Sequence, residues 1–239
     1  MSPAACYLDP AVETIAEVVA RLAAIQADLD QNRPSRDGVG CFNKLYAVIT
    51  ADVQMGVKDQ AYVDNDFMAD LDVAFANRYF DALRDDAQSP GTAPEPWKVL
   101  LAKRDDADIA SLQFAVAGVN AHIDFDLAAA VVEVWKKRGG GPHDVKQHVT
   151  YQQIDQVFAK EMSKLRHKFE TSGERDLDKG QMRTFLNFVS DWTVNLSRDL
   201  AWGHASMMWH ARLLGIDPLY MHGLSLSAGI AGDTILMHL

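Results

Sequence analysis

The chain has 239 residues, of which 48% are hydrophobic, and carries a formal net charge of -10. This length and apolar content suffice for one domain with a substantial core, so we expect residues 1–239 to form a single domain. The acidic balance repels phosphate groups, which disfavours nucleic acid or an anionic membrane as the main partner.

The amino-terminal residues do not read as an export signal. The stretch MSPAACYLDPAVETIAEVV lacks a basic region, and Glu13 and Glu17 interrupt its apolar run. No segment combines about 18 uncharged apolar residues with the flanks of a membrane span. The two cysteines, Cys6 and Cys41, are too few for a disulfide framework. We therefore expect a cytoplasmic protein that has no membrane partner.

Helix signals dominate the first part of the chain. The pair Asp9–Pro10 resembles an N-cap followed by a first-turn proline, and apolar residues then recur at spacings of three and four up to Leu29. A second helix is predicted over residues 41–55, with apolar side chains gathered on one face.

A third helix is predicted to begin at the cap signal Asp64–Asn65 and carries apolar residues at a spacing of four up to Leu83. Residues 88–97, QSPGTAPEPW, are the part of the chain richest in proline and glycine. Such a composition predicts a surface connection.

A long fourth helix is predicted over residues 108–136, and the glycines of RGGGPHD at 138–144 end it. No charged residue occurs from Ile109 to Ala121 or from Leu127 to Val132. A helix without a charged face is typical of the interior. We therefore expect this helix to lie buried at the centre of the molecule.

The last third of the chain also predicts helices. Thr150 and Gln153 resemble a capping box that opens a fifth helix, and a polar loop at 171–180 separates it from a sixth helix over 182–214. The apolar tail 221–239 is expected to pack on the body. Because strand-type alternation is absent, the sequence predicts an all-α, single-domain, multi-helix bundle with a buried central helix.

Four polar side chains interrupt the middle of the predicted central helix, namely Asn120, His122, Asp124 and Asp126. Residues four apart share a helix face, so they form the pairs His122/Asp126 and Asn120/Asp124. Burying such groups unpaired would cost several kcal/mol each. An imidazole and a carboxylate one turn apart can share a proton, bind one metal ion or form a structural hydrogen bond.

Other helices offer polar residues that could complete a site. His204 lies on an apolar face of the sixth helix, while Asp199 and Trp202 lie on another face. Asp72 falls at the edge of the apolar stripe of the third helix, and Tyr46 carries a hydroxyl on the apolar face of the second.

The segment GVNAHIDFDLAAA at 118–130 resembles the bacterial domain-of-unknown-function family 5995, whose members carry a Gly-x-Asn-Ala-His-Ile-x-x-Asp-Leu core. The preceding Leu-Gln-Phe-Ala run at 112–115 and the segments LYAVIT at 45–50 and DFMADLDVAFANRYFDAL at 66–83 are also similar to that family. The resemblance therefore covers most of residues 40–135.

This resemblance implies an all-helical protein with Asn120, His122 and Asp126 at the signature positions, and it implies no activity. The chain departs from the family pattern at Asp124, where a neutral residue such as asparagine is expected. The additional carboxylate leaves the role of this position open.

Three functional hypotheses follow from these residues. In the first, the protein is an enzyme that acts on a small, largely apolar molecule in a pocket between the fourth and sixth helices. His122 is the general acid or base, Asp126 orients it, and Asp124 or His204 completes proton transfer. Residues expected to contact the substrate are Asn120, Tyr46, Asp72, Asp199 and Trp202.

The second hypothesis is a divalent-metal-dependent hydrolase, in which His122, Asp126 and His204 hold zinc or iron and the metal activates water. The third is a non-catalytic helical binding or scaffold protein, whose buried polar cluster determines how the helices align. The spacing of the residues is compatible with all three.

Overall fold

The computed structural model describes residues 5–154, 157 and 194–237. Within these residues every regular element is a helix and none is a strand, which confirms the predicted all-α bundle. Sequence periodicity was sufficient for this conclusion because an amphipathic helix and a half-buried strand repeat their apolar residues at different intervals.

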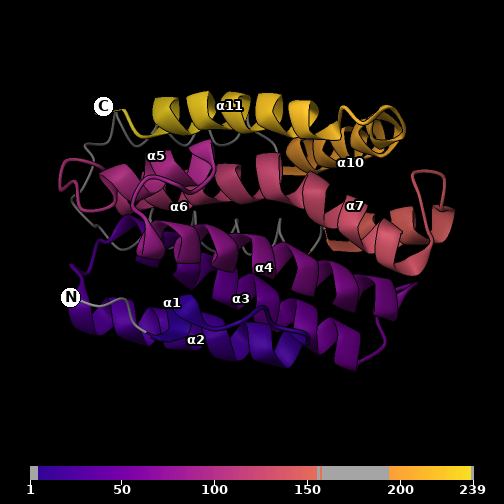
Figure 1. The fold of residues 1–239 in the computed structure, drawn as a ribbon. Helices are drawn as coiled ribbons and strands as arrows, with labels where there is room; N and C mark the ends of the chain where they lie inside the picture. The colour runs from indigo at the N-terminus through magenta and orange to yellow at the C-terminus, as the bar shows by residue number, and fades with distance from the viewer. Residues whose placement is uncertain (1–4, 155–156, 158–193, 238–239) are drawn as a thin grey trace.

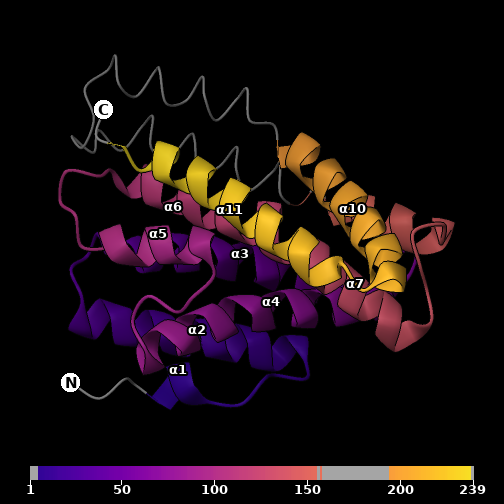
Figure 2. The same ribbon diagram turned by 45° about the horizontal axis from the view of Figure 1, so that its top comes forward.

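The helices form layers on either side of a long central helix (Figures 1 and 2). On one side, α3 (Gly38–Lys58) and α4 (Asn65–Gln88) pack against the central helix, and α2 (Ile15–Asn32) covers them from outside. On the other side lies α11 (Asp217–Ile235). The central helix is thereby enclosed by neighbours.

The first long helix begins later than predicted. A short helix, α1 (Ala5–Leu8), precedes it, and α2 is capped by Thr14, whose Oγ1 accepts a hydrogen bond from the Glu17 backbone N–H. The Glu17 carboxylate accepts the Thr14 backbone N–H in return. The expectation that Asp9–Pro10 opens this helix is therefore wrong, because the capping box at Thr14 satisfies the free N–H groups instead.

Two further helices confirm their predictions. α3 extends the expected 41–55 segment at both ends, and Asp37 caps it by accepting the Gly40 N–H. α4 begins after Asp64 as predicted, because the Asp64 carboxylate accepts the Phe67 N–H at 2.9 Å.

The predicted surface connection at 88–97 is wrong in its last part. Residues from Glu95 onward form α5 (Glu95–Lys103), and Trp97 is completely buried. Pro96 lies in the first turn, where the missing N–H costs no hydrogen bond. Proline therefore marks a helix start here, although the composition around it resembles a loop.

The central helix consists of three consecutive pieces. α6 (Ser111–Asn120) leads into a π-helical turn, η1 (Ala121–Asp126), and α7 (Leu127–Arg138) follows. In η1 the Leu127 N–H bonds to the His122 carbonyl, five residues back. Gly139, at φ 73°, ends α7 as the glycine signal predicted. The expected helix is present, but its middle turn is wider than α-helical.

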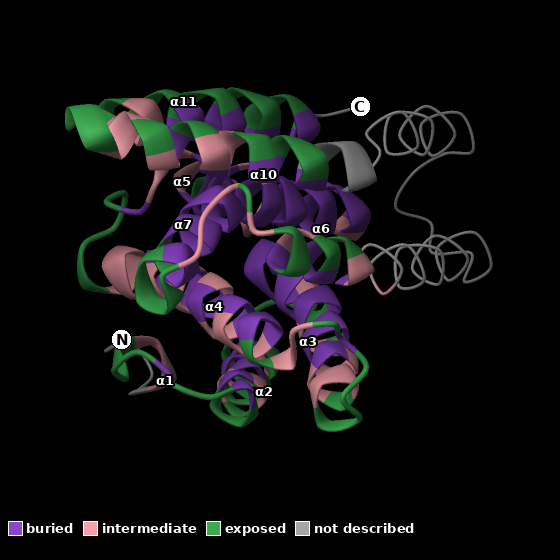
Figure 3. Ribbon diagram, turned by 90° about the vertical axis from the view of Figure 1, so that its right-hand side faces the viewer, coloured by how far each residue is buried: buried purple, intermediate pink, exposed green. Residues whose placement is uncertain are grey.

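The central helix is buried along most of its length (Figure 3). By length and composition alone, the span 111–138 is apolar enough to cross a membrane, with a mean hydropathy of 1.4, and it is the one such helix among the described residues. However, 94% of that window is buried within the protein, as in the core helix of a soluble protein.

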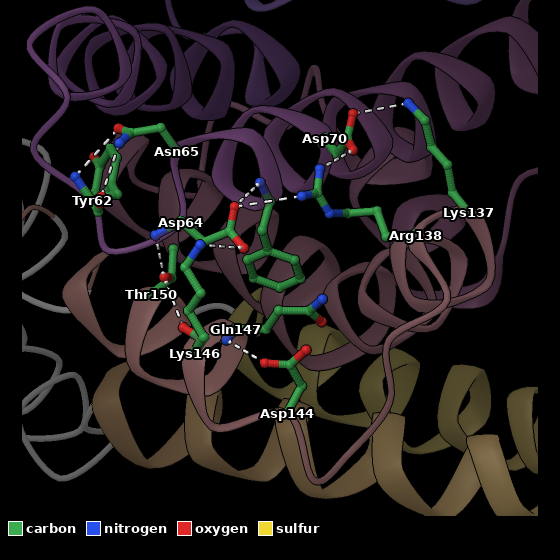
Figure 4. A network of polar contacts seen from close by, with 11 residues as sticks. Tyr62, Asp64, Asn65, Asp70, Lys137, Arg138, Asp144, Lys146, Gln147 and Thr150 are labelled. Atoms are coloured by element: carbon green, nitrogen blue, oxygen red, sulfur yellow. Dashed lines mark hydrogen bonds and ion pairs between the residues drawn. The ribbon is translucent and has the colours of Figure 1, made fainter.

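The helix predicted from Thr150 begins earlier, at residue 145, because Asp144 caps it by accepting the Gln147 N–H at 3.0 Å. Thr150 is not an N-cap: its hydroxyl donates to the Lys146 carbonyl and accepts the Asp64 N–H (Figure 4). The later part of this predicted helix, the loop 171–180 and the start of the predicted sixth helix lie outside the described residues.

An ionic network connects the start of α4 to the end of α7 (Figure 4). Asp70 accepts hydrogen bonds from Lys137 at 2.8 Å and Arg138 at 3.0 Å. Asp64 forms longer ion pairs of 3.5 Å with Arg138 and Lys146. Carboxylates near a helix N-terminus and cations near a C-terminus also match the two helix dipoles.

The end of the chain packs on the body, as predicted. α10 (Val194–Ala211) continues into a 3-10 turn, Arg212–Leu214, which ends at Gly215. α11 then runs back along α5 and α6. The buried Gln113 amide of α6 donates to the backbone carbonyls of Ile235 and Met237, which attaches the end of α11 to the central helix.

Candidate active site

The π-helical turn brings an imidazole and a carboxylate together inside the protein. Nδ1 of His122 lies 3.0 Å from Oδ2 of Asp126, and both side chains are at most 3% exposed. The indole Nε1–H of Trp97 donates to the same Oδ2 at 2.8 Å. Asp126 is thus held from two sides, by α5 and by its own helix.

The protonation of His122 follows from these contacts. Burial lowers the pKa of His122, and the hydrogen bond and charge of Asp126 oppose this shift only in part. A carboxylate accepts hydrogen bonds, so Nδ1 of the neutral ring carries the proton and donates to Asp126. The other nitrogen, Nε2, is then an acceptor, and it is buried without a hydrogen-bond partner.

The His122 ring is fixed by aromatic neighbours. Phe75 of α4 stacks on it with ring centroids 3.4 Å apart and planes 8° from parallel. Tyr46 meets its edge at 4.6 Å, and Phe42 and Trp97 lie 5.6 and 5.9 Å away. These rings leave the imidazole little freedom to rotate, so Nε2 keeps a constant direction.

His122 lines a cavity of about 40 Å³ between α3, α4 and the central helix. A cavity needs roughly 10–15 Å³ for each water molecule, so this one has room for about three water molecules. Most of its wall is apolar. The apolar lining residues are Phe42, Leu45, Ile49, Val53, Leu71, Phe75, Val119, Ile123, Leu127 and Ile154.

Three more polar side chains line the same cavity: Asp72 of α4, Tyr46 of α3 and Arg198 of α10. Oδ2 of Asp72, the Tyr46 hydroxyl and Nε2 of His122 are buried and have no well-formed hydrogen bond. Thr50 makes a weak hydrogen bond to the Tyr46 oxygen, which lowers the pKa of Tyr46 by less than burial raises it and leaves the phenolic proton free to donate. Buried polar atoms are normally paired, because leaving one unpaired costs about 1–3 kcal/mol. Three such atoms around one cavity therefore indicate a place for a polar ligand.

The charges of these groups are set by burial. Burial raises the pKa of Asp72 to about 7. The pKa of Tyr46 is raised well above its ordinary value, first by burial and then by the nearby carboxyl of Asp72. At neutral pH the Tyr46 hydroxyl is protonated, and a large fraction of Asp72 is protonated as well. The cavity therefore contains a base and two hydroxyl-type donors.

The pocket position differs from the prediction in one respect. It was expected between the fourth and sixth helices, but α3 and α4 form most of its wall, and Arg198 is the described residue of α10 that reaches it. The Arg198 guanidinium donates to the Tyr151 carbonyl at 2.7 Å and lies over the Tyr151 ring. The sequence does not show which neighbours a helix has, so this could not be read from periodicity.

Asn120 and Asp124 lie away from the cavity. The Asn120 amide donates to the Ala228 carbonyl of α11 at 2.9 Å, so the residue joins two helices. It was expected to contact a substrate, but it does not line the cavity. Asp124 is half-buried and also absent from the cavity wall. The two pairs thus make contacts in different directions, and of the four residues only His122 lines the cavity.

The predicted residues of the sixth helix also lie elsewhere. Nδ1 of His204 lies 2.6 Å from the Tyr220 hydroxyl of α11, and Asp199 is exposed. Trp202 packs edge-on against Trp135 at 5.0 Å and against Tyr151. None of the three lines the cavity, so the structure does not bring them together with His122 as expected.

The predicted metal-ligand set is not assembled. Among the described residues, no group of three His, Cys, Asp or Glu side chains could hold a metal ion. His122 and Asp126 are together, but His204 is engaged with Tyr220. The structure therefore does not bring together the three residues that were expected to bind zinc or iron.

Sequence patterns did not identify three parts of the site: Trp97, Phe75 and the π-helical turn. The Pro96–Trp97 pair offered one signal, because a proline followed by a large apolar residue is compatible with a helix start. The π turn offered none, since such turns are rare and have no distinctive residue pattern.

A family model described as "Family of unknown function (DUF5995)" matches residues 15–236, which is nearly the whole chain. This confirms the resemblance inferred from residues 45–50, 66–83 and 112–130. No curated protein and no solved structure matches.

Proposed function

The chain belongs to this family of unknown function, and from the geometry of the cavity we propose that it is an enzyme that transfers protons on a small, largely apolar molecule. His122 is the general base, and Asp126 holds its ring and its tautomer. The single observation that carries the proposal is that Nε2 of His122 is buried without a hydrogen-bond partner in a residue that lines a cavity.

The Asp126–His122 contact is suited to this role. An ionised carboxylate behind an imidazole stabilises the imidazolium form that appears when Nε2 takes a proton. The lowered pKa of His122 keeps the ring neutral, and therefore basic, at neutral pH. Asp72 replaces Asp124 and His204 as the second titrating group, because it shares the cavity with His122.

The unpaired atoms favour an enzyme over a scaffold. A buried polar network that only aligns helices is expected to satisfy its own members. Asn120, which does not line the cavity, satisfies its amide nitrogen and keeps Oδ1 unpaired. The Gln113 amide satisfies both of its atoms, because Nε2 donates to carbonyls of α11 and Oε1 accepts the Ala110 N–H. By contrast, Tyr46, Asp72 and His122 each keep a buried polar atom without a well-formed hydrogen bond. The net charge of -10 also supports a small neutral substrate in preference to nucleic acid.

The test compares His122→Asn with the wild type on a panel of small neutral compounds: ketones, aldehydes, alkenes, epoxides, alcohols and esters. Asparagine places an amide nitrogen where Nδ1 stands, so the Asp126 contact is retained while Nε2 is removed. NMR follows conversion or proton exchange of each compound. We expect at least one class to be turned over by the wild type and about 100-fold more slowly by the variant.

The matched control is His204→Asn, which makes the same change outside the cavity and is expected to retain turnover. Thermal unfolding verifies that both variants are folded. Equal turnover by wild type and His122→Asn, or no turnover of any class, would contradict the proposed function.

A further inference from the structure

The three unpaired atoms of the cavity define the ligand that fits it. Nε2 of His122 accepts a hydrogen bond or a proton, because Nδ1 carries the ring proton. The Tyr46 hydroxyl donates, since burial keeps its proton in place. The carboxyl of Asp72 also donates when it is protonated, and burial alone raises its pKa to about 7. The set is therefore one acceptor and two donors.

Building on the proposed function, we propose that the substrate is a small, uncharged carbonyl compound that is enolised in this cavity. Its oxygen accepts hydrogen bonds from the Tyr46 hydroxyl and the Asp72 carboxyl, and Nε2 of His122 removes a proton from the adjacent carbon. A neutral base beside two neutral donors suits a reaction in which negative charge develops on an oxygen.

The cavity wall supports an uncharged substrate. Ten apolar residues surround the polar atoms, and burying a charged group among them would be costly. The one cationic side chain in the wall, within the described residues, is Arg198, and its guanidinium is engaged with the Tyr151 carbonyl and ring. The volume of about 40 Å³ restricts the cavity to a compound of a few heavy atoms.

The proposed step is balanced without any further reactant. The bond between the α-carbon and hydrogen breaks, and a bond between that hydrogen and Nε2 of His122 forms. The electron pair left on carbon forms a carbon–carbon double bond, while the carbonyl pair moves to oxygen, where Tyr46 and Asp72 stabilise it. Return of a proton from His122 to carbon regenerates a carbonyl compound, and in deuterated water that proton is exchanged for deuterium.

The experiment uses acetone and butanone as probes in deuterated buffer, with 1H NMR following loss of the α-proton signals. We expect the full-length wild type to accelerate exchange above the buffer rate, and His122→Asn to abolish the acceleration. Tyr46→Phe removes one donor at nearly constant volume and should slow exchange about 100-fold. The carbon-bound protons of 2-butanol, which has no carbonyl group, should not exchange.

The Asp72 variants separate hydrogen bonding from a structural role. Asp72→Asn keeps a donor of the same shape, so α-proton exchange should persist. The exchange rate should no longer change with pH through the ionisation of Asp72. Asp72→Leu removes the donor and should slow exchange like Tyr46→Phe. The 13C signal of carbonyl-labelled acetone gives an independent reading, because hydrogen bonds from Tyr46 and Asp72 shift it downfield. That shift should shrink in Tyr46→Phe, whose fold is checked by circular dichroism.

The inference is overturned if wild-type protein does not accelerate exchange of either ketone, or if His122→Asn does so equally. If the wild type instead converts an alkene or epoxide in a His122-dependent reaction, the proposed function stands and the carbonyl substrate is wrong. If His122→Asn matches the wild type on every compound class, the proposed function itself fails. The two failures are thus distinguished by the same set of measurements.

Discussion

At the scale of single residues, Asp72 opposes folding in a pH-dependent way. Burial alone raises its pKa from 3.8 to about 7. Tyr46, His122 and Arg198 line the cavity that it shares, and Tyr62 is also close enough to have its pKa raised by Asp72. Ionising this carboxyl inside the fold is therefore unfavourable.

The sign follows from proton binding. Between about pH 4 and pH 7 the unfolded chain releases the Asp72 proton and the folded chain keeps it. The contribution of this group to the free energy of unfolding is greatest below pH 4 and is lost as pH rises through about 7. The total decrease is up to about 4 kcal/mol. We expect Asp72→Asn to remove this loss and to be more stable than wild type at pH 8, measured by urea unfolding at several pH values.

Asp70, two residues earlier on α4, is the control with the opposite sign. Burial alone would raise its pKa, but hydrogen bonds from Lys137 and Arg138 lower it. Its contribution to stability is therefore present at neutral pH and is lost on acidification. Asp70→Asn should destabilise the protein at pH 7. An equal effect of both substitutions at every pH would contradict the assignment of Asp72.

Trp97 holds Asp126 in place for His122. In Trp97→Phe the indole donor is lost while an aromatic ring remains, so one buried carboxylate oxygen loses a partner at 2.8 Å. We expect the protein to lose about 1–3 kcal/mol of stability. The pKa of His122 should rise, because Asp126 then interacts more strongly with the imidazole.

A titration of the histidine 15N signals measures the effect of Trp97→Phe directly. Trp209→Phe is the matched variant, since Trp209 packs against Trp135 and Arg212 away from the cavity. It should leave the pKa of His122 unchanged. An unchanged His122 pKa in Trp97→Phe would show that the indole does not influence the pair.

At the scale of elements, α3 and α6 approach closely at a glycine. A Cβ added to Gly118 would lie 2.4–2.5 Å from the first side-chain atoms of Phe42, which cannot move without moving α3. We expect Gly118→Ala to destabilise the protein by about 1–3 kcal/mol. Phe42 lines the cavity, so ketone exchange should fall as well.

Gly203, exposed within α10, is the control for that change. Among the described residues, no atom outside its own stretch of helix lies within 4 Å of the position that its Cβ would occupy. Gly203→Ala should therefore stabilise the protein by about 0.5–1 kcal/mol, because alanine is the better helix former. Thermal unfolding of both variants tests the pair. If Gly118→Ala were as stable as the wild type, the helices would not be in contact there.

At the scale of the whole molecule, stability should be greatest along the central helix. Every residue from Leu112 to Ile123 is buried, whereas Leu213, Leu214 and Leu219, at the corner between α10 and α11, are each more than 70% exposed. We expect amides of α6 and α7 to exchange with solvent only on global unfolding, and those of the 212–216 corner to exchange much faster. Hydrogen exchange followed by NMR measures both. Similar rates in the two regions would contradict a single enclosed centre.

Much of the fold could be predicted from the sequence because the relevant signals are local. The apolar spacing of α3 and α4, the Asp64 cap and the glycines at 139 and 215 each depend on neighbouring residues alone. The absence of charge on both faces of the segment around Val116 likewise predicted a buried helix. For the same reason, the pairing of His122 with Asp126, one turn apart, was among the possible outcomes.

The other parts of the site depend on contacts between distant segments. Trp97 meets Asp126 only because α5 folds back against the central helix, and Tyr46 meets Asp72 only because α3 and α4 pack together. His204, equally suitable by residue type, faces Tyr220 instead. The sequence by itself determined the helices and the polar pair in the core. Only the tertiary structure decided which polar groups share a cavity, because burial and pKa depend on neighbours that local periodicity does not specify.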